Sequence, residues 1–233
     1  SADAVLSQEE KEAGVVLVDI GGGTTDIAIF FDNIIRHTAV IPFGGNVVTE
    51  DIRQGCGIMR DQAELLKTKF GSALAAENKE NEVVCIPGLR GREPKEISLR
   101  TLAEVIQSRM EEILEHVYFE IKNSGLEKQL IAGVVLTGGG AQLKHLKQLV
   151  EYMTGMSTRI GYPNEHITKS AVEDVTSPLH ATGVGLVMKG FDYLDRRRPH
   201  AADARNPTRR SASTVKEHSE PGRIGSFFKS VLS

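Results

Sequence analysis

Two apolar segments of this sequence each lead into a cluster of three glycines. Residues 15–18 lead to glycines 21–23, and these are followed by a segment at 25–31 in which apolar and polar residues alternate. Residues 133–136 lead to glycines 138–140. Short apolar runs bounded by turn residues are typical of buried strands, and alternation is typical of a strand with one covered face. The pattern predicts an α/β fold in which two strands end in glycine-rich tips.

Longer segments with apolar residues at helical spacing lie between the two tips and after them. After a strand at 34–42, a helix is expected to begin at the glycines of 44–45. The next helix carries Glu64 and Lys67, which are three positions apart and therefore share a face. Further along, two short strands are expected before a long helix that starts at Ser98 and carries a continuous apolar stripe. A helix is also expected directly after the second tip.

The C-terminal region has a different composition. A last helix of the body is expected at 177–188, and the segment 195–222 that follows has almost no apolar residues. Such a segment cannot bury enough surface to offset its ordering entropy, so we predict a disordered linker. The final segment, 223–233, predicts an amphipathic helix on a membrane surface, with docking into a protein groove as the alternative. Its apolar face consists of Ile224, Phe227, Phe228, Val231 and Leu232, with Lys229 on the opposite face.

Charge and composition narrow the classes of protein. Residues 195–233 carry nine Lys or Arg and four Asp or Glu, so this segment is basic. The whole chain, with 28 Lys or Arg and 31 Asp or Glu, is slightly acidic. A basic tail on an acidic body favours an anionic membrane surface as a partner, and we expect no nucleic-acid partner. Two cysteines give no disulfide framework, and no apolar run reaches about 18 residues. No Ser–His–Asp order, HExxH pair or CxxC motif supports a hydrolase, a zinc protease or a redox protein.

The first glycine tip carries the residues best suited to binding an anion together with a cation. Glycines 21–23 have no Cβ atoms, so their backbone N–H groups can approach a phosphate. Thr24 and Thr25 add hydroxyl donors, while Asp19 and Asp26 are placed to hold phosphates and a hydrated cation. A strand rather than a helix follows the tip, which excludes the P-loop and the dinucleotide fingerprint. A glycine-rich hairpin with two turn-capping aspartates is the alternative.

These segments, in this order, resemble the second half of the actin-like ATPase superfamily, which has a ribonuclease H-like fold and includes Hsp70 chaperones and sugar kinases. DIGGGTTD at 19–26 is similar to its second phosphate loop, and LTGGGAQL at 136–143 is similar to its adenosine motif. Within the superfamily, 35–52, 101–114 and the adenosine motif resemble the bacterial cell-division family FtsA. The resemblance covers residues 2–192.

The resemblance implies an actin-like ATPase half with a small α+β insertion subdomain. Because the family has a first phosphate loop and a whole N-terminal half ahead of this region, we expect a C-terminal fragment that holds half of a nucleotide cleft. The expected divisions are 1–52 with 126–194 for the nucleotide-binding core, 53–125 for the insertion, 195–222 for the disordered linker and 223–233 for the amphipathic helix.

ATP and Mg²⁺ are the cofactors that the resemblance implies. Asp19 would hold the magnesium through its water shell, and Asp19 and Asp26 are candidate catalytic residues of what is at most a weak ATPase. Glu64 and Lys67 would contact the ribose, although a solvated ion pair is the alternative for these two. The expected nucleotide-binding residues are Asp19, Gly21, Gly22, Gly23, Thr24, Thr25, Gly45, Glu64, Lys67, Gly138, Gly139 and Gly140.

The resemblance also implies a function in cell division. An FtsA-like protein anchors the ring of the tubulin-like protein FtsZ to the inner face of the cytoplasmic membrane at the septum, and it helps to recruit other divisome proteins. We expect the insertion to hold the FtsZ C-terminal tail through Arg90, Arg92 and Lys95, and the chain to self-associate into filaments. The alternatives are a sugar-kinase-like phosphotransferase, an Hsp70-like chaperone and a pilus-assembly member of the same superfamily.

Overall fold

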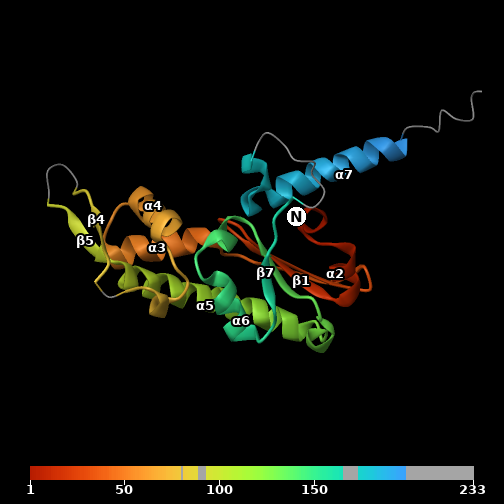
Figure 1. The fold of residues 1–233 in the computed structure, drawn as a ribbon, viewed down its shortest axis with the longest axis horizontal. Helices are drawn as coiled ribbons and strands as arrows, with labels where there is room; N and C mark the ends of the chain where they lie inside the picture. The colour runs from red at the N-terminus through yellow and green to blue at the C-terminus, as the bar shows by residue number, and fades with distance from the viewer. Residues whose placement is uncertain (80, 89–92, 165–172, 198–233) are drawn as a thin grey trace, which may run out of the picture. The chain divides into compact units, whose positions relative to one another are not determined.

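The computed structural model describes residues 1–79, 81–88, 93–164 and 173–197 (Figure 1). Among these residues, five strands form one mixed sheet in the order β3-β2-β1-β6-β7. The pairs β1–β2 and β2–β3 are antiparallel, whereas β6 runs parallel to both β1 and β7. The strands are β1 (Val15–Ile20), β2 (Thr25–Phe31), β3 (Ile34–Ile41), β6 (Gly133–Thr137) and β7 (Thr158–Ile160). The two glycine tips therefore leave neighbouring parallel strands at the same edge of the sheet.

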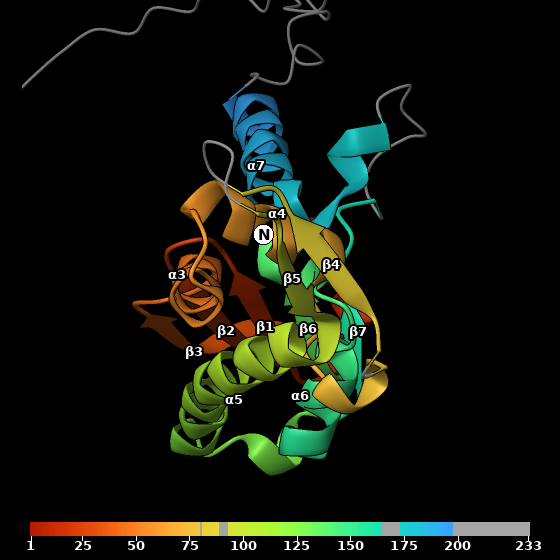
Figure 2. The same cartoon turned by 90° about the vertical axis from the view of Figure 1, so that its left-hand side faces the viewer.

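Alternate residues of β1 face two different hydrophobic cores. Val16, Val18 and Ile20 belong to the larger core with α3, α4, α5 and α6, whereas Val15 and Leu17 pack with α1 and α7. Helix α5 lies against β2 and β3 on the larger-core face, and Figure 2 shows it in front of the strands. The helices are α1 (Ala2–Val5), α2 (Gln8–Ala13), α3 (Gly45–Cys56), α4 (Arg60–Phe70), α5 (Leu99–Asn123), α6 (Leu146–Thr154) and α7 (Ala181–Arg197). Short 3₁₀ helices are η1 (Ala75–Glu77), η3 (Glu127–Gln129), η4 (Gly139–Gln142), η5 (Glu173–Thr176) and η6 (Pro178–His180).

A separate antiparallel hairpin, β4 (Val83–Ile86) with β5 (Lys95–Ser98), precedes α5. The hairpin residues Ile86 and Ile97 belong to the same buried core as the strand residues of the larger-core face. At the other end of α5, His37 Nε2 lies 2.9 Å from Glu120 Oε2 and joins the helix to β3. The apolar stripe predicted for α5 is confirmed, since its buried residues are Leu102, Ala103, Ile106, Met110, Ile113, Leu114, Val117 and Ile121. Helix α5 thus joins the expected insertion to the sheet through one continuous core.

The helix after the second tip begins later than the sequence predicted. The glycines lead into η4, and α6 starts only at Leu146. Between them, Lys144 forms an isolated parallel bridge with Ser72, and His145 takes a left-handed backbone with φ of 60°. These tertiary constraints, which short-range periodicity does not report, delay the start of the helix.

Helix α7 extends further than the sequence predicted. It was expected to end at Met188, but it continues to Arg197 and so takes in the first three residues of the segment assigned to the linker. The sequence offers no proline after Pro178 until Pro199, and Gly190, the one glycine beyond Met188 in the helix, is tolerated inside a helix at a cost of about 1 kcal/mol. The remainder of the expected linker and the whole amphipathic segment lie outside the described residues.

Candidate functional site

Two aspartates face each other across the central strands. Asp19 of β1 is the register partner of Asp26 of β2 and of Thr137 of β6. Register partners point to the same face of a sheet, so both carboxylates emerge on one side near the end of β1. Thr24 Oγ1 donates a hydrogen bond of 3.1 Å to Asp26 Oδ2. Because like charges directly opposite each other are destabilising, this pair favours a bound cation.

Magnesium fits this pair of carboxylates. Mg²⁺ is bound in proteins by one or two carboxylates together with water and the phosphates of a substrate, rather than by an all-protein cage. Asp19 and Asp26 supply two carboxylates. Over the residues that the structure describes, no group of three or more His, Cys, Asp or Glu side chains gathers as a metal cluster would. The donor set therefore matches an ion shared with phosphates.

The turn between β1 and β2 presents open backbone N–H groups. The N–H of Gly21 donates to the Thr24 carbonyl at 2.9 Å, but those of Gly22 and Gly23 find no acceptor among the described residues. A Cβ placed on Gly23 would meet nothing within 4 Å, and one on Gly22 would meet only the side chain of Asn46. Packing within the protein does not account for glycine at these two positions. Their missing side chains leave the N–H groups open to an anion.

The start of α3 is joined to the first tip. The N–H of Gly45 donates to the Gly21 carbonyl at 2.9 Å, and the N–H of Asn46 donates to the Gly22 carbonyl at 2.8 Å. A Cβ on Gly44 would lie 2.5 Å from the Gly21 oxygen, so only glycine allows this close approach. The glycines that open α3 are thus packed directly against the first tip.

Thr25 takes part in the same junction. Its side chain is buried, and Oγ1 donates to the Phe43 carbonyl at 3.0 Å. This hydroxyl, which was expected to donate to an anion, is already used to hold β2 to the segment that precedes α3. Thr24 is exposed at the tip, in contrast.

Lys67 lies at the centre of a polar cluster between α3 and α4. Its Nζ donates to the Gly45 carbonyl at 2.9 Å, to Thr49 Oγ1 at 2.7 Å and to Glu64 Oε2 at 2.8 Å. Only 16% of the Lys67 side chain is exposed, against 47% of Glu64, so the lysine is largely shielded from water while the carboxylate stays partly solvated. Burial raises the pKa of Glu64, but the hydrogen bonds from Lys67 and Thr49 outweigh it and leave that pKa below its ordinary value.

No sequence motif pointed to Thr49. Its hydroxyl donates to Glu64 Oε2 at 2.5 Å, and its side chain is buried. The signal was its position one helical turn after Gly45, next to the apolar Val48 on the core-facing side of α3. A threonine in such a stripe needs a polar partner, and here it finds one on α4.

The second tip closes onto the end of β1. A Cβ on Gly138 would lie 2.5 Å from Asp19 Oδ1 and 2.6 Å from the Ile20 carbonyl oxygen. A Cβ on Gly140 would lie 2.4 Å from Ile20 Cγ2. Gly139 differs, because a Cβ there would meet only the Leu179 side chain, at 3.1 Å. Gly138 and Gly140 are thus required by packing against the end of β1, whereas at Gly139 the Leu179 side chain would have to shift slightly.

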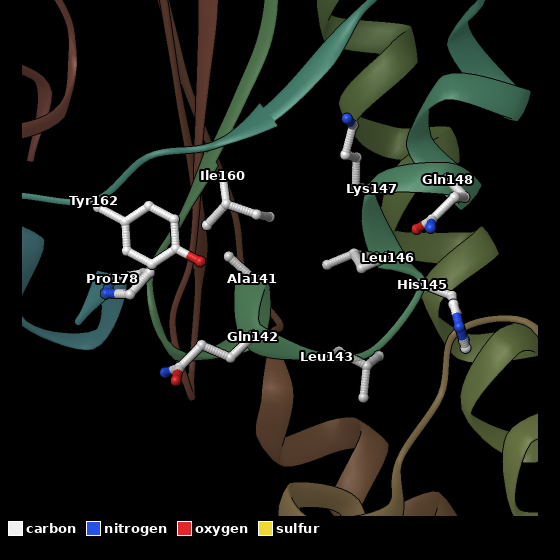
Figure 3. Close-up of a pocket in the computed structure, with 10 residues that line it drawn as sticks. All are labelled: Ala141, Gln142, Leu143, His145, Leu146, Lys147, Gln148, Ile160, Tyr162 and Pro178. Carbon is white, nitrogen blue, oxygen red and sulfur yellow. The ribbon is translucent and has the colours of Figure 1, made fainter.

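A cavity of about 350 Å³ borders the second tip. Figure 3 shows Tyr162 and Ile160 on one side of it, Leu146 on the other, and Gln142 along its edge. Its lining includes residues of η4 and α6 but neither the two aspartates nor Lys67. No sequence motif predicts this cavity, because Tyr162 simply follows the edge strand β7.

The predicted partner and membrane contacts lie away from the glycine tips or outside the residues that the structure describes. Lys95 is exposed at the start of β5, and its Nζ donates to the carbonyl of Cys56, the last residue of α3. A lysine there also interacts favourably with the negative end of the helix dipole. Arg90 and Arg92 lie outside the described residues, as do the predicted membrane contacts Ile224, Phe227, Phe228, Lys229, Val231 and Leu232. None of the described helices is long and apolar enough to cross a bilayer.

The sheet order, the two tips and the covering helices define an actin-like α/β ATPase fold. MreB5 of Spiroplasma citri bound to ADP has a TM-score of 0.66 at 22% identity, covering 84% of this chain and 59% of that one. The type IV pilus complex PilM–PilN has a TM-score of 0.59 at 18% identity, and the match covers 81% of this chain and 48% of that one. The ethanolamine utilization protein EutJ from Carboxydothermus hydrogenoformans has a TM-score of 0.52 at 22% identity, covering 76% and 48%. These likenesses establish the fold.

Sequence comparison identifies the family within this class. The profile of the family described as "Cell division protein FtsA" matches residues 16–185. The FtsA of Pseudomonas aeruginosa is 43% identical over 191 residues, covering 82% of this chain and 45% of that protein. The FtsA of Escherichia coli (strain K12) is 40% identical over 197 residues, covering 82% and 46%. The chain belongs to the FtsA family of cell-division proteins, and it spans about half the length of the curated relatives it matches.

Proposed function

We propose that this chain binds ATP with Mg²⁺ at the sheet edge where the two glycine tips meet. The observation that carries the proposal is the cross-strand pair Asp19 and Asp26 beside a turn with open N–H groups. Two facing carboxylates favour a cation, and the open N–H groups of Gly22 and Gly23 favour an anion. A magnesium nucleotide supplies both charges in one ligand.

Each part of the site has a proposed role in holding the nucleotide. Bound Mg²⁺ would neutralise phosphate charge, Asp19 would hold its water shell, and Asp26 would position water or the ion. Residues 21–24 would bind the β- and γ-phosphates. Glu64 and Lys67, with Gly45, would contact the ribose, and Gly139 with its glycine neighbours would lie against the adenosine. The similar MreB5 structures were solved with ADP and with AMPPNP, which supports an adenine nucleotide as the ligand.

The test of this site is an isosteric change at Asp19. Asp19→Asn removes the negative charge at the end of β1 and keeps the side-chain shape, so the affinity for Mg-ATP should fall at least about tenfold, or 1.4 kcal/mol. Asp32→Asn is the matched control, because Asp32 is exposed at the other end of β2 with a φ of 53° that asparagine tolerates. Titration with a fluorescent ATP analogue measures both. Equal affinity of D19N and the parent would contradict the proposed site.

We propose that the chain acts in division by linking FtsZ filaments to the membrane. The family assignment supports this function, and the basic character of residues 195–233 supports a contact with anionic lipid. The segment 53–125 would hold the FtsZ tail, with Arg90, Arg92 and Lys95 as its basic contacts. Self-association into filaments would multiply weak membrane contacts. The proposed location is the cytoplasmic face of the inner membrane at the septum, together with other divisome proteins.

A further inference from the structure

The direction of the Asp19 side chain follows from the alternation along β1. Val16, Val18 and Ile20 face the larger core, so the odd-numbered positions face the opposite side. Val15 and Leu17 on that side pack with α1 and α7. The carboxylate of Asp19 therefore emerges on the face that α7 covers, and not on the face of α3 and α4.

The first turn of α7 contacts this carboxylate. Thr182, the second residue of the helix, donates from Oγ1 to Asp19 Oδ2 at 2.9 Å. The other carboxylate oxygen, Oδ1, lies against Gly138, where a Cβ would be only 2.5 Å away. One oxygen of Asp19 is thus held by a hydrogen bond, and the other lies close to the backbone of Gly138.

The backbone around Thr182 is itself fixed. Ala181 is 1% exposed in the smaller core with Val15 and Leu17. Just before it, the carbonyl of Pro178 accepts a hydrogen bond of 3.2 Å from the Gly138 N–H, which ties the approach to α7 to the second tip. Thr182 is therefore presented to Asp19 by a rigid support, as a positioning group requires.

We infer that Thr182 is a positioning residue that sets the Asp19 carboxylate for the cation. This inference rests on the proposed nucleotide site. A neutral hydroxyl donates one hydrogen bond without cancelling the negative charge, so the carboxylate keeps its attraction for a hydrated ion. Holding one oxygen also fixes the orientation of the other. A carboxylate that is already oriented binds the cation more tightly, because its side chain loses less freedom on binding. No motif in the sequence pointed to Thr182, since it lies 163 positions from Asp19.

Thr182→Val tests this role, because it removes the hydroxyl and keeps the shape. Titration with a fluorescent ATP analogue, in Mg²⁺ and separately in EDTA, should show Mg-ATP affinity about tenfold lower and metal-free affinity unchanged. Thr182→Ser keeps the hydroxyl and should retain the parent's affinity for Mg-ATP. Thr101→Val is the matched control, because Thr101 is an exposed threonine in the first turn of α5.

The outcomes separate this inference from the proposed function. If the parent binds Mg-ATP more tightly than metal-free ATP, and T182V binds both as the parent does, the role of Thr182 is wrong while the nucleotide site stands. If the parent binds equally with and without Mg²⁺, the proposed metal site fails and this role fails with it. An equal loss in both conditions for T182V, or a loss in T182S as large as in T182V, would indicate a general structural effect and overturn the positioning role. Urea unfolding of each variant checks that the fold is intact.

Discussion

At the scale of single residues, the glycines around the first tip differ in what a side chain at each position would meet. Gly44 is required by the protein, because a Cβ there would overlap the Gly21 and Thr24 carbonyl oxygens at 2.5 and 2.9 Å. Gly23 has open space at its side-chain position, so packing within the protein does not require glycine there. The same alanine substitution therefore separates stability from binding.

Gly23→Ala should leave the free energy of unfolding within about 0.5 kcal/mol of the parent, while lowering the affinity for Mg-ATP. The added methyl group would occupy space proposed for phosphate oxygens. Gly44→Ala should instead cost about 1–3 kcal/mol of stability, because a backbone contact must shift. Urea unfolding and nucleotide titration of both variants give the two quantities. If G23A is as unstable as G44A, the conclusion that a side chain at position 23 meets open space is wrong.

Candidate site residues could be predicted from the sequence where the residues next to them along the chain form a recognisable pattern. Asp19, Asp26 and the glycines were found because a strand, a turn and a second strand are local patterns. Thr49 and Thr182 could not be found in this way, because each acquires its polar partner only when a separate helix is packed in place. The expected role of Thr25 changed for the same reason, since its acceptor Phe43 lies 18 positions away.

At the scale of elements, α2 shows how a local signal and a distant contact combine. A capping box begins this helix: Glu10 N–H donates to Ser7 Oγ at 3.2 Å, and Ser7 N–H donates to Glu10 Oε2 at 2.9 Å. The same carboxylate receives two hydrogen bonds of 2.6 Å from Arg159 at the edge strand β7. One residue therefore caps α2 and fastens it to the sheet.

The contribution of Glu10 to stability should depend on pH. Burial raises the pKa of Glu10, but the Arg159 and Ser7 hydrogen bonds outweigh it and lower that pKa from its ordinary value. A lowered folded-state pKa means that the stabilisation is present above about pH 4.3 and is lost as the pH falls through the folded-state pKa. Urea unfolding across a pH series should therefore show the deficit of Glu10→Gln shrinking toward acid.

The control for this series is Glu12→Gln, since Glu12 is exposed on the same helix. It should differ little from the parent at each pH, because an exposed charge contributes little to stability. A deficit of E10Q that stays constant from neutral to acid pH would show that the charge of Glu10 does not contribute to folding.

Element types were predictable, and several element ends were not. The strands at 25–31 and 83–86 and the helix beginning at Gly45 follow from periodicity and turn residues. The delayed start of α6 depends on the bridge between Ser72 and Lys144, which joins segments that are 72 residues apart. Such contacts form only in the folded chain, so no local signal reports them.

At the scale of the whole molecule, the sequence predicts a division of charge between an acidic body and a basic tail. The described part of the chain contains the sheet, its two cores and the candidate nucleotide site. The amphipathic segment 223–233 lies outside the described residues and stays a prediction from periodicity. The family assignment and the fold are confirmed, and the membrane contact now depends on experiment.

Phe227→Glu with Phe228→Glu should release the chain from anionic vesicles, because two charges would enter the apolar face that binds lipid. Ser226→Glu with Ser230→Glu adds the same charge to the polar face, so it should weaken binding only through electrostatics and retain part of it at low salt. Sedimentation with vesicles measures both. Equal binding of the double phenylalanine variant and the parent would rule out the membrane contact and favour docking into a protein groove.

The central claim is that an adenine nucleotide binds where the two glycine tips meet, and amide chemical shifts test it most directly. In a ¹⁵N–¹H NMR titration of the chain with Mg-ATP to several millimolar, the account predicts shifts at Gly22, Gly23 and Gly139. Asn33, at the opposite end of β2, and Gly155, at the end of α6, should not move. Shifts confined to the cavity beside Tyr162, or no shifts at all, would contradict the account.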